Sequence, residues 1–294
     1  MSIPRDWAQQ VAGDLFTITS IVTGFENIHT YSPKFSEIQS VKNADLFIWM
    51  GLEGVEQWVK DVIADMPANK ILTLINASAG EYIEHDDVTG VDNPHVWMSP
   101  VNAKEMVEKI YSRFVELDGA NEATYTVNRN HYKTELDDLL ASIEQKKTAF
   151  NGLKVVVHHP SFKYLFDLLG IDRVAAVEEK EGSEPSAQHI ADVTQLMKEQ
   201  NITLLVNQPQ LAEDDIVEIA RDTGAKIADL TPLLPVEVDG WEKETVETYV
   251  DMIRYDIWAL ENPHDPPAVT VSSAGLLIAV TALVVRTGAW KRKR

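Results

Sequence analysis

The sequence contains no cysteine. The chain therefore has neither a disulfide framework nor a thiolate metal site, and any metal ion must be held by histidine, carboxylate or other oxygen ligands. The HExxH signature of helical zinc proteases is absent as well. These absences make the placement of the histidines the first question to ask of the sequence.

The N-terminus lacks the apolar run of a secretory signal, since Arg5 and Asp6 fall within the first seven residues. We therefore expect that sequence upstream of Met1 is missing. An apolar run occurs instead near the C-terminus, where residues 268–285 are eighteen positions without a charge. As a helix such a run spans about 27 Å, close to the hydrocarbon thickness of a bilayer. We interpret residues 268–286 as a transmembrane anchor, and a buried core helix is the less favoured alternative.

Charge is distributed unevenly along the chain. Residues 263–294 hold five basic residues and one acid, which leaves 21 basic and 45 acidic residues, a net charge of −24, in the body. The positive-inside rule keeps the basic tail, residues 287–294, in the cytoplasm, so we expect a single-pass protein whose body lies outside the cell membrane. The acidic body argues against nucleic acid as a partner and favours attraction of cations, solubility or life in high salt.

The body alternates short β-rich runs with amphipathic helical windows, a pattern typical of parallel sheets covered by helices on both faces. The predicted strands are Leu15–Ile21, Asp45–Trp49, Ile71–Ile75, Lys154–Val157, Arg173–Val177, Ile202–Val206 and Lys226–Ala228. The predicted helices between them are Ser36–Lys42, Val55–Met66, Phe162–Leu169, Ala187–Gln200, Ala212–Thr223 and Thr245–Leu260.

One stretch breaks this alternation. After a helical window at Val101–Leu117, residues 121–150 contain neither proline nor glycine and repeat apolar residues at helical spacing, which predicts one helix about 45 Å long. The predicted fold is therefore α/β, with two lobes joined by a long helix and a ligand site in the cleft between them. The predicted divisions are a first lobe at residues 1–118, the linking helix at 119–150, a second lobe at 151–262 and a linker at 263–267.

Three histidines lie where an apolar stretch meets a turn that contains proline. His29, His95 and His159 are 66 and 64 residues apart, which suggests a site assembled from separate loops. Three imidazoles with an acid or water as fourth partner make a tetrahedral zinc site. His158 is an alternative to His159, because alternation along a strand directs only one of the two to a given face.

The remaining histidines carry weaker predictions. His85, in an acidic loop, would collect metal weakly at the mouth of the cleft, although an exposed loop residue is the favoured interpretation. His131, His189 and His264 fall on a helix face, at a helix start and in the linker, and we assign them no role.

Taken together, these segments resemble the metal-binding component of zinc and manganese ABC transporters, the cluster 9 solute-binding proteins. The resemblance covers roughly residues 3–260, and its most specific motif is Asn93–Trp97. The other matching segments are Glu26–Pro33, His159–Leu165, Glu184–Ser186 and Gln208–Gln210.

The resemblance implies one divalent ion held between the lobes, by His29 and His95 from the first and His159 from the second. The ion would be captured outside the cell and delivered to an ABC transporter permease. Where the family commonly has an aspartate as fourth ligand, this chain has Thr231, so water or Asp229 would take that place. A family glutamate is replaced by Gln208. Three imidazoles without a carboxylate favour Zn²⁺ over Mn²⁺, although Mn²⁺ stays possible.

Two other functions remain open. Three histidines with an open fourth position also form the ligand set of a hydrolytic zinc, for which Glu26 is the best candidate general base. The changes at Thr231 and Gln208 are also compatible with a metal-free member that serves as a surface scaffold or adhesin. We favour the binding protein over the scaffold, and we do not expect an enzyme.

Overall fold

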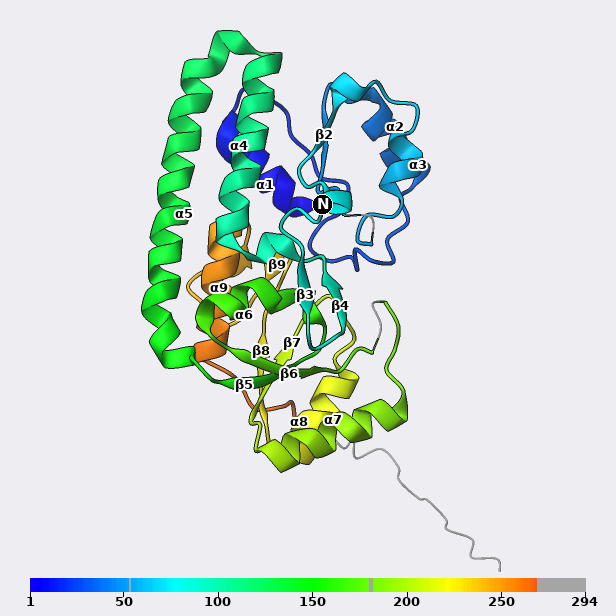
Figure 1. The fold of residues 1–294 in the computed structure, drawn as a ribbon, viewed down its shortest axis with the longest axis vertical. Helices are drawn as coiled ribbons and strands as arrows, with labels where there is room; N and C mark the ends of the chain where they lie inside the picture. Colours follow the sequence, from blue (N-terminus) through cyan, green and yellow to red (C-terminus); the bar gives the residue numbers. More distant parts are fainter. Residues whose placement is uncertain (53, 180–181, 269–294) are drawn as a thin grey trace, which may run out of the picture.

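The computed structural model describes residues 1–52, 54–179 and 182–268. Figure 1 shows an α/β protein in which a long helix, α5 (Glu122–Phe150), runs beside an N-terminal part (residues 1–118) and a C-terminal part (residues 151–262). The elements of the N-terminal part are α1 (Ser2–Ala12), α2 (Phe35–Asn43), β1 (Phe47–Trp49), α3 (Val59–Ile63), β2 (Ile71–Thr73), β3 (Glu84–Asp86), β4 (Val91–Asn93) and α4 (Pro100–Leu117), with short 3₁₀ turns at Ala68–Lys70, Ala77–Ala79 and Val96–Met98.

The N-terminal part contains two small sheets. Strands β1 and β2 pair in parallel, with Phe47 opposite Ile71. Strands β3 and β4 form an antiparallel hairpin, with Asp86 opposite Val91. This hairpin reaches from the N-terminal part toward the strands of the C-terminal part (Figure 1). It carries Asp86 and Asn93, which are hydrogen-bonded to each other, and Asn93 contacts His95.

The predicted strand at Leu15–Ile21 is wrong, because the structure has no strand there. Phe16 packs on helices instead: its ring centroid lies 5.0 Å from that of Phe114 in α4 and 6.0 Å from that of Tyr125. Phe16, Ile18 and Ile21 are partly buried against the core, whereas Leu15 is exposed. The other predicted strands are confirmed, and all but Lys154–Val157 have at least one end shifted by one or two residues.

Helix α5 confirms the predicted long helix, and its 29 residues make it about 44 Å long. It packs against α1 and α4 at one end and against α6 (Lys163–Leu169) and α9 (Tyr249–Glu261) at the other. Its buried side chains are Tyr125, Tyr132, Leu136, Leu139, Ile143 and Phe150. One straight element thus contacts both parts of the molecule.

The C-terminal part is built on a parallel four-stranded sheet with the order β6-β5-β7-β8. One face packs on α7 and α8 through Val156, Leu205, Met197 and Ile216, and α6 and α9 lie on the other side. The elements are β5 (Lys154–Val157), a 3₁₀ turn (Pro160–Phe162), α6 (Lys163–Leu169), β6 (Asp172–Ala176), α7 (Ala187–Gln200), β7 (Leu204–Asn207), α8 (Asp214–Thr223), β8 (Lys226–Asp229), β9 (Val236–Glu237), β10 (Thr245–Val246) and α9 (Tyr249–Glu261).

The larger of two apolar clusters among the described residues runs through both parts. It includes fully buried Trp7 of α1, Val107 of α4, Leu165 of α6 and Tyr249 of α9. The Trp97 indole N–H donates to the Pro232 carbonyl at 2.9 Å, and the Tyr249 hydroxyl donates to the Trp97 carbonyl at 2.7 Å. The predicted division into lobes at residues 118 and 150 therefore stays a prediction, since the two parts share this cluster.

The described chain ends on the outer edge of the C-terminal sheet. His264 forms an isolated antiparallel bridge with Ile227, and its Nε2 lies 2.8 Å from an Asp229 carboxylate oxygen. Among the described residues, no helix is both long and apolar enough to cross a membrane. The predicted anchor at residues 268–286 lies, apart from Ala268, outside the described residues, as does the predicted tail at 287–294.

Candidate metal centre

The three predicted histidines come from three loops that meet between the two parts of the molecule. His29 lies in a turn, where its backbone N–H donates to the Asn27 side-chain oxygen at 3.0 Å. His95 precedes a 3₁₀ turn, and His159 follows β5 at the carboxyl end of the parallel sheet. Ligand sites in open α/β sheets form at this end of the strands, which agrees with the predicted location.

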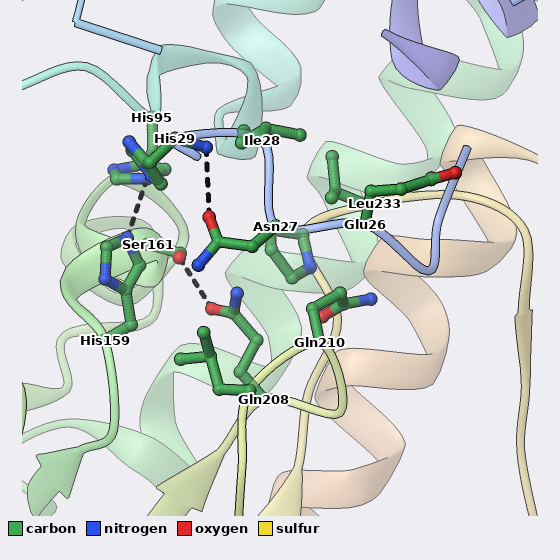
Figure 2. A pocket seen from close by; sticks show the side chains of 12 residues that line it. Glu26, Asn27, Ile28, His29, His95, His159, Ser161, Gln208, Gln210 and Leu233 are labelled. Atoms are coloured by element: carbon green, nitrogen blue, oxygen red, sulfur yellow. Dashed lines mark hydrogen bonds between the residues drawn. The ribbon is translucent and has the colours of Figure 1, made fainter. Parts of the chain in front are cut away.

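The ring nitrogens converge (Figure 2). The Nε2 atoms of His29 and His95 are 3.3 Å apart, those of His95 and His159 are 3.1 Å apart, and all three residues offer ligand atoms within 4.8 Å of one another. A tetrahedral zinc ion with Zn–N bonds of about 2.0–2.1 Å separates its nitrogens by about 3.3 Å. The spacing of the imidazoles therefore fits a small tetrahedral ion.

His95 is oriented by the side chain of Asn93, the last residue of β4 in the β3–β4 hairpin. Its Nδ1 lies 2.9 Å from the Asn93 side-chain oxygen, while the Asn93 amide group donates to Asp86 and to the Pro160 carbonyl, each at 2.8 Å. Because both amide hydrogens of Asn93 are engaged, its oxygen must accept, and Nδ1 of His95 must carry the proton. The Nε2 lone pair of His95 is therefore directed at the other two rings.

His159 is oriented by Glu178, a residue that the sequence analysis did not identify. Val157 of β5 is paired with Ala176 of β6, so His159 and Glu178 each lie two residues past a paired position. The His159 Nδ1 donates to a Glu178 carboxylate oxygen in a short hydrogen bond, and the other oxygen accepts from the Gly182 backbone N–H at 2.5 Å. Carboxylate–histidine pairs of this kind fix the tautomer of a metal ligand and raise its basicity.

Burial keeps two of the imidazoles neutral. Desolvation, followed by the proximity of His159, lowers the pKa of His29 from 6.5 to about 4. Complete burial, with His159 and His29 nearby, lowers the pKa of His95 well below its usual value. Burial alone would raise the pKa of Glu178, but the hydrogen bond and charge of His159 outweigh it and lower that pKa. The centre thus holds neutral donors beside an ionised carboxylate.

The three rings border a cavity of about 10 Å³, a volume close to that of one water-sized sphere. Its polar wall is neutral, consisting of Asn27, Ser161, Gln208 and Gln210. Glu26 also borders it, but its carboxylate accepts from the Thr23 backbone N–H at 2.9 Å and hydroxyl at 2.6 Å and is directed away from the histidines (Figure 2). Glu26 is therefore not placed to act as a general base there.

Thr231, at the position of the family's fourth ligand, and Asp229, its predicted substitute, both form hydrogen bonds with other groups. The Thr231 hydroxyl donates to the Leu233 carbonyl and accepts from Gln210, both at 2.9 Å. The Asp229 carboxylate accepts from Asn207 at 2.8 Å and lies against His264. Gln208 does border the cavity, and its side-chain oxygen accepts from Ser161 at 2.7 Å.

The remaining histidines lie outside this cluster. His158 points toward Asn207, with its Nδ1 3.1 Å from the side-chain oxygen, so His159 rather than His158 faces the other rings. His85 lies on β3 with 57% of its side chain exposed, 3.5 Å from Asp92. His131 lies exposed on α5, and His189 lies on α7, where its Nε2 contacts the Ala176 carbonyl.

The low pKa values predict acid-resistant metal binding. Protons compete with a metal ion only as the pH approaches the pKa of the ligand, so a pKa of about 4 for His29 and a strongly lowered one for His95 delay that competition. We expect bound zinc to persist as the pH falls through 6.5 and to be released only as the pH approaches the pKa of His29, about 4. Dialysis at stepped pH with zinc counted by mass spectrometry measures this, and steep loss between pH 7 and 6.5 would contradict it.

An α/β fold with a parallel sheet and a long helix, in which three histidines from separate loops meet, is that of a solute-binding protein. The chain belongs to the family described as "Zinc-uptake complex component A periplasmic", whose model matches residues 1–262.

The relatives are named for several metals. The chain is 27% identical to "Iron-binding protein YfeA" of Yersinia pestis over 267 residues, which covers 87% of this chain and 82% of that protein. It is 26% identical to "Manganese-binding lipoprotein MntA" of Halalkalibacterium halodurans, covering 87% of this chain and 84% of that protein. It also matches "Crystal structure of ZnuA" with a TM-score of 0.72 and 25% identity, covering 88% and 95% of the two chains. The predicted resemblance to this family is confirmed.

Proposed function

We propose that this protein captures a divalent transition-metal ion, zinc in preference to manganese, and delivers it to an ABC transporter permease. The observation that carries the proposal is the convergence of His29, His95 and His159, with Nε2 atoms 3.1 and 3.3 Å apart. Membership of the zinc-uptake family and relatives named for iron and manganese support a metal as the cargo.

Zinc is preferred because of the kinds of atoms that face the ion. The proposed ligands are three imidazole nitrogens, and the neutral side chains of Asn27 and Gln208 line the same cavity. Manganese favours carboxylate and carbonyl oxygens, whereas imidazole suits zinc. The Glu178 carboxylate acts indirectly, through its hydrogen bond with His159, and offsets part of the charge of the ion. We propose that water completes the tetrahedron.

The hydrolase alternative has little support at this centre. A cavity of about 10 Å³ admits a water-sized group and not an ester or peptide as well. The candidate base, Glu26, is held by Thr23. The metal-free scaffold or adhesin has weaker support than the binding protein, because both His95 and His159 are oriented with their Nε2 atoms inward, an arrangement that a scaffold does not require.

We further propose that the body works on the outer side of the cell membrane, near the permease. The family description and the lipoprotein relatives support such a location. Membrane attachment through residues 268–286 stays a prediction from the sequence. Tethering would raise the effective concentration of the loaded protein at the permease.

Growth under zinc limitation tests delivery. A strain lacking this protein should grow poorly when a chelator removes free zinc, and the wild-type chain should restore growth while His95→Ala should not. His131→Ala is the matched control, because His131 lies exposed on α5 and should restore growth fully. Full restoration by His95→Ala, at equal protein level, would overturn the proposal.

A further inference from the structure

The linker, residues 263–267, lies against the edge of the C-terminal sheet. His264 exchanges two backbone hydrogen bonds with Ile227 of β8: the Ile227 N–H donates to the His264 carbonyl at 2.8 Å, and the His264 N–H donates to the Ile227 carbonyl at 2.9 Å. Because β8 is an outer strand of its sheet, its outward-facing backbone groups need such a partner. Arg221 of α8 also donates to the Pro267 carbonyl. The linker is thus fixed to the C-terminal part at two points.

The imidazole of His264 is placed so that both of its ring nitrogens donate. Its Nε2 lies 2.8 Å from an Asp229 carboxylate oxygen, and its Nδ1 lies 2.9 Å from the Asp265 carbonyl oxygen. A carbonyl oxygen and an ionised carboxylate can only accept, and a histidine that donates from both nitrogens is the charged imidazolium. The geometry therefore selects the charged form of His264.

The groups around His264 favour the same form. Burial alone would lower the pKa of His264, but hydrogen bonds to the Asp265 carbonyl and to Asp229, with the charges of Asp229 and Glu213, outweigh it and raise that pKa above 6.5. Arg221, the basic residue of α8 at this edge, contacts the Pro267 carbonyl instead. A raised histidine pKa stabilises the folded arrangement fully below the ordinary value, and this stabilisation is lost as the pH rises through the raised value.

We infer that His264 is a pH-sensitive clasp, whose imidazolium holds the linker against β8 in neutral and acidic solution and frees it as the solution becomes alkaline. The inference does not depend on metal binding. It gives a role to a histidine that the sequence alone left without one.

The clasp directs the chain away from the metal centre. Strand β8 runs toward the centre, since Asp229 at its end is followed by Pro232 and Leu233, which border the metal cavity. The bridge to His264 is antiparallel, so the linker runs back toward the start of β8. Release of its five residues would free about 17 Å of extended chain. If residues beyond 267 tether the body, as the sequence predicts, the metal centre would reach further from its tether in alkaline solution.

Nuclear magnetic resonance of the full-length protein with ¹⁵N-labelled histidine measures the protonation of His264, whose signals are assigned by their loss in His264→Gln. We expect the pKa of His264 to lie above 6.5 in the wild type. Asp229→Asn removes the charge with little change of shape and should lower that pKa. A wild-type pKa at or below 6.5, or an unchanged pKa in Asp229→Asn, would overturn the inference.

Hydrogen exchange of the Ile227 backbone amide measures release of the linker, because this amide donates to the His264 carbonyl. The side chains of His264 and Asp229 are 49% and 38% exposed, and such an ion pair changes an equilibrium roughly 1.5- to 5-fold. At about pH 6, protection of this amide in the wild type should exceed that in His264→Gln by this factor. At about pH 9 the two proteins should be equal, because the imidazole is then neutral. The same ratio at both pH values would contradict a pH-sensitive clasp.

His131→Gln is the matched control. His131 lies exposed on α5, 3.6 Å from Glu135, so its replacement removes a histidine–carboxylate contact on a different element. It should leave exchange of the Ile227 amide unchanged at both pH values. Both measurements use the metal-free protein, so a wild type that binds no zinc would refute the proposed function and still report the state of the clasp.

Discussion

Replacing His95 by alanine should abolish tight zinc binding. Structural zinc sites bind with about 10–16 kcal/mol, so one of four ligands is worth roughly 2.5–4 kcal/mol, or about a 100- to 1,000-fold change in Kd. His95 should lie at the upper end, because its Nε2 is within 3.1 and 3.3 Å of the other two and it is almost fully buried. Competition titration against a chelator of known affinity measures the change.

His85→Ala provides the matched control for that experiment. His85 lies on the same hairpin as Asn93, but it faces solvent beside Asp92. Its replacement should change zinc affinity less than twofold while leaving the fold intact. If His85→Ala weakened tight binding as much as His95→Ala, the metal would be held at the hairpin surface and the assignment of the centre would be wrong.

Replacing Glu178 should produce the second largest loss of zinc affinity. Removing the carboxylate that orients a metal-bound histidine costs about 10- to 100-fold in metal affinity. Glu178→Ala also leaves the Nδ1–H of His159 without its acceptor inside a buried site, since the His159 side chain is 2% exposed. We expect zinc affinity to fall by that amount in the same competition titration.

The conservative variant Glu178→Gln separates charge from geometry. Its side-chain oxygen can still accept from His159, but it lacks the charge that makes the imidazole a stronger ligand. Its affinity should therefore lie between those of the wild type and Glu178→Ala. Glu179→Ala is the neighbouring control, because the Glu179 carboxylate accepts from the Ser186 backbone N–H, away from the histidines. Wild-type affinity in Glu178→Ala would show that His159 does not depend on this partner.

Local sequence signals were sufficient for much of the fold. The run of valines in Lys154–Val157, bounded by histidine and proline, gives a strand with the predicted ends. Helix Ala187–Gln200 also has its predicted ends, because the Ser186 side chain caps it by accepting from the His189 N–H at 3.2 Å. The prediction of a strand at Leu15–Ile21 was wrong because alternation of apolar and polar residues indicates that one face is buried. It does not indicate whether the backbone has a partner strand.

The groups that orient the histidines could not be predicted in the same way. Glu178 reaches His159 only because Val157 is paired with Ala176, and strand register between distant segments is not visible in a single sequence. Asn93, which orients His95, is held in part by the Pro160 carbonyl, 67 positions further along the chain. An acidic residue just beyond the end of a strand was the one available signal for Glu178.

Calorimetric titration of the purified, chelator-treated protein with zinc and with manganese, with bound metal counted by mass spectrometry, tests the central claim most directly. We predict one zinc ion per chain, bound more tightly than manganese, and no tight site in His95→Ala. A folded wild-type protein that binds neither metal, or that prefers manganese to zinc, would contradict a three-histidine zinc centre.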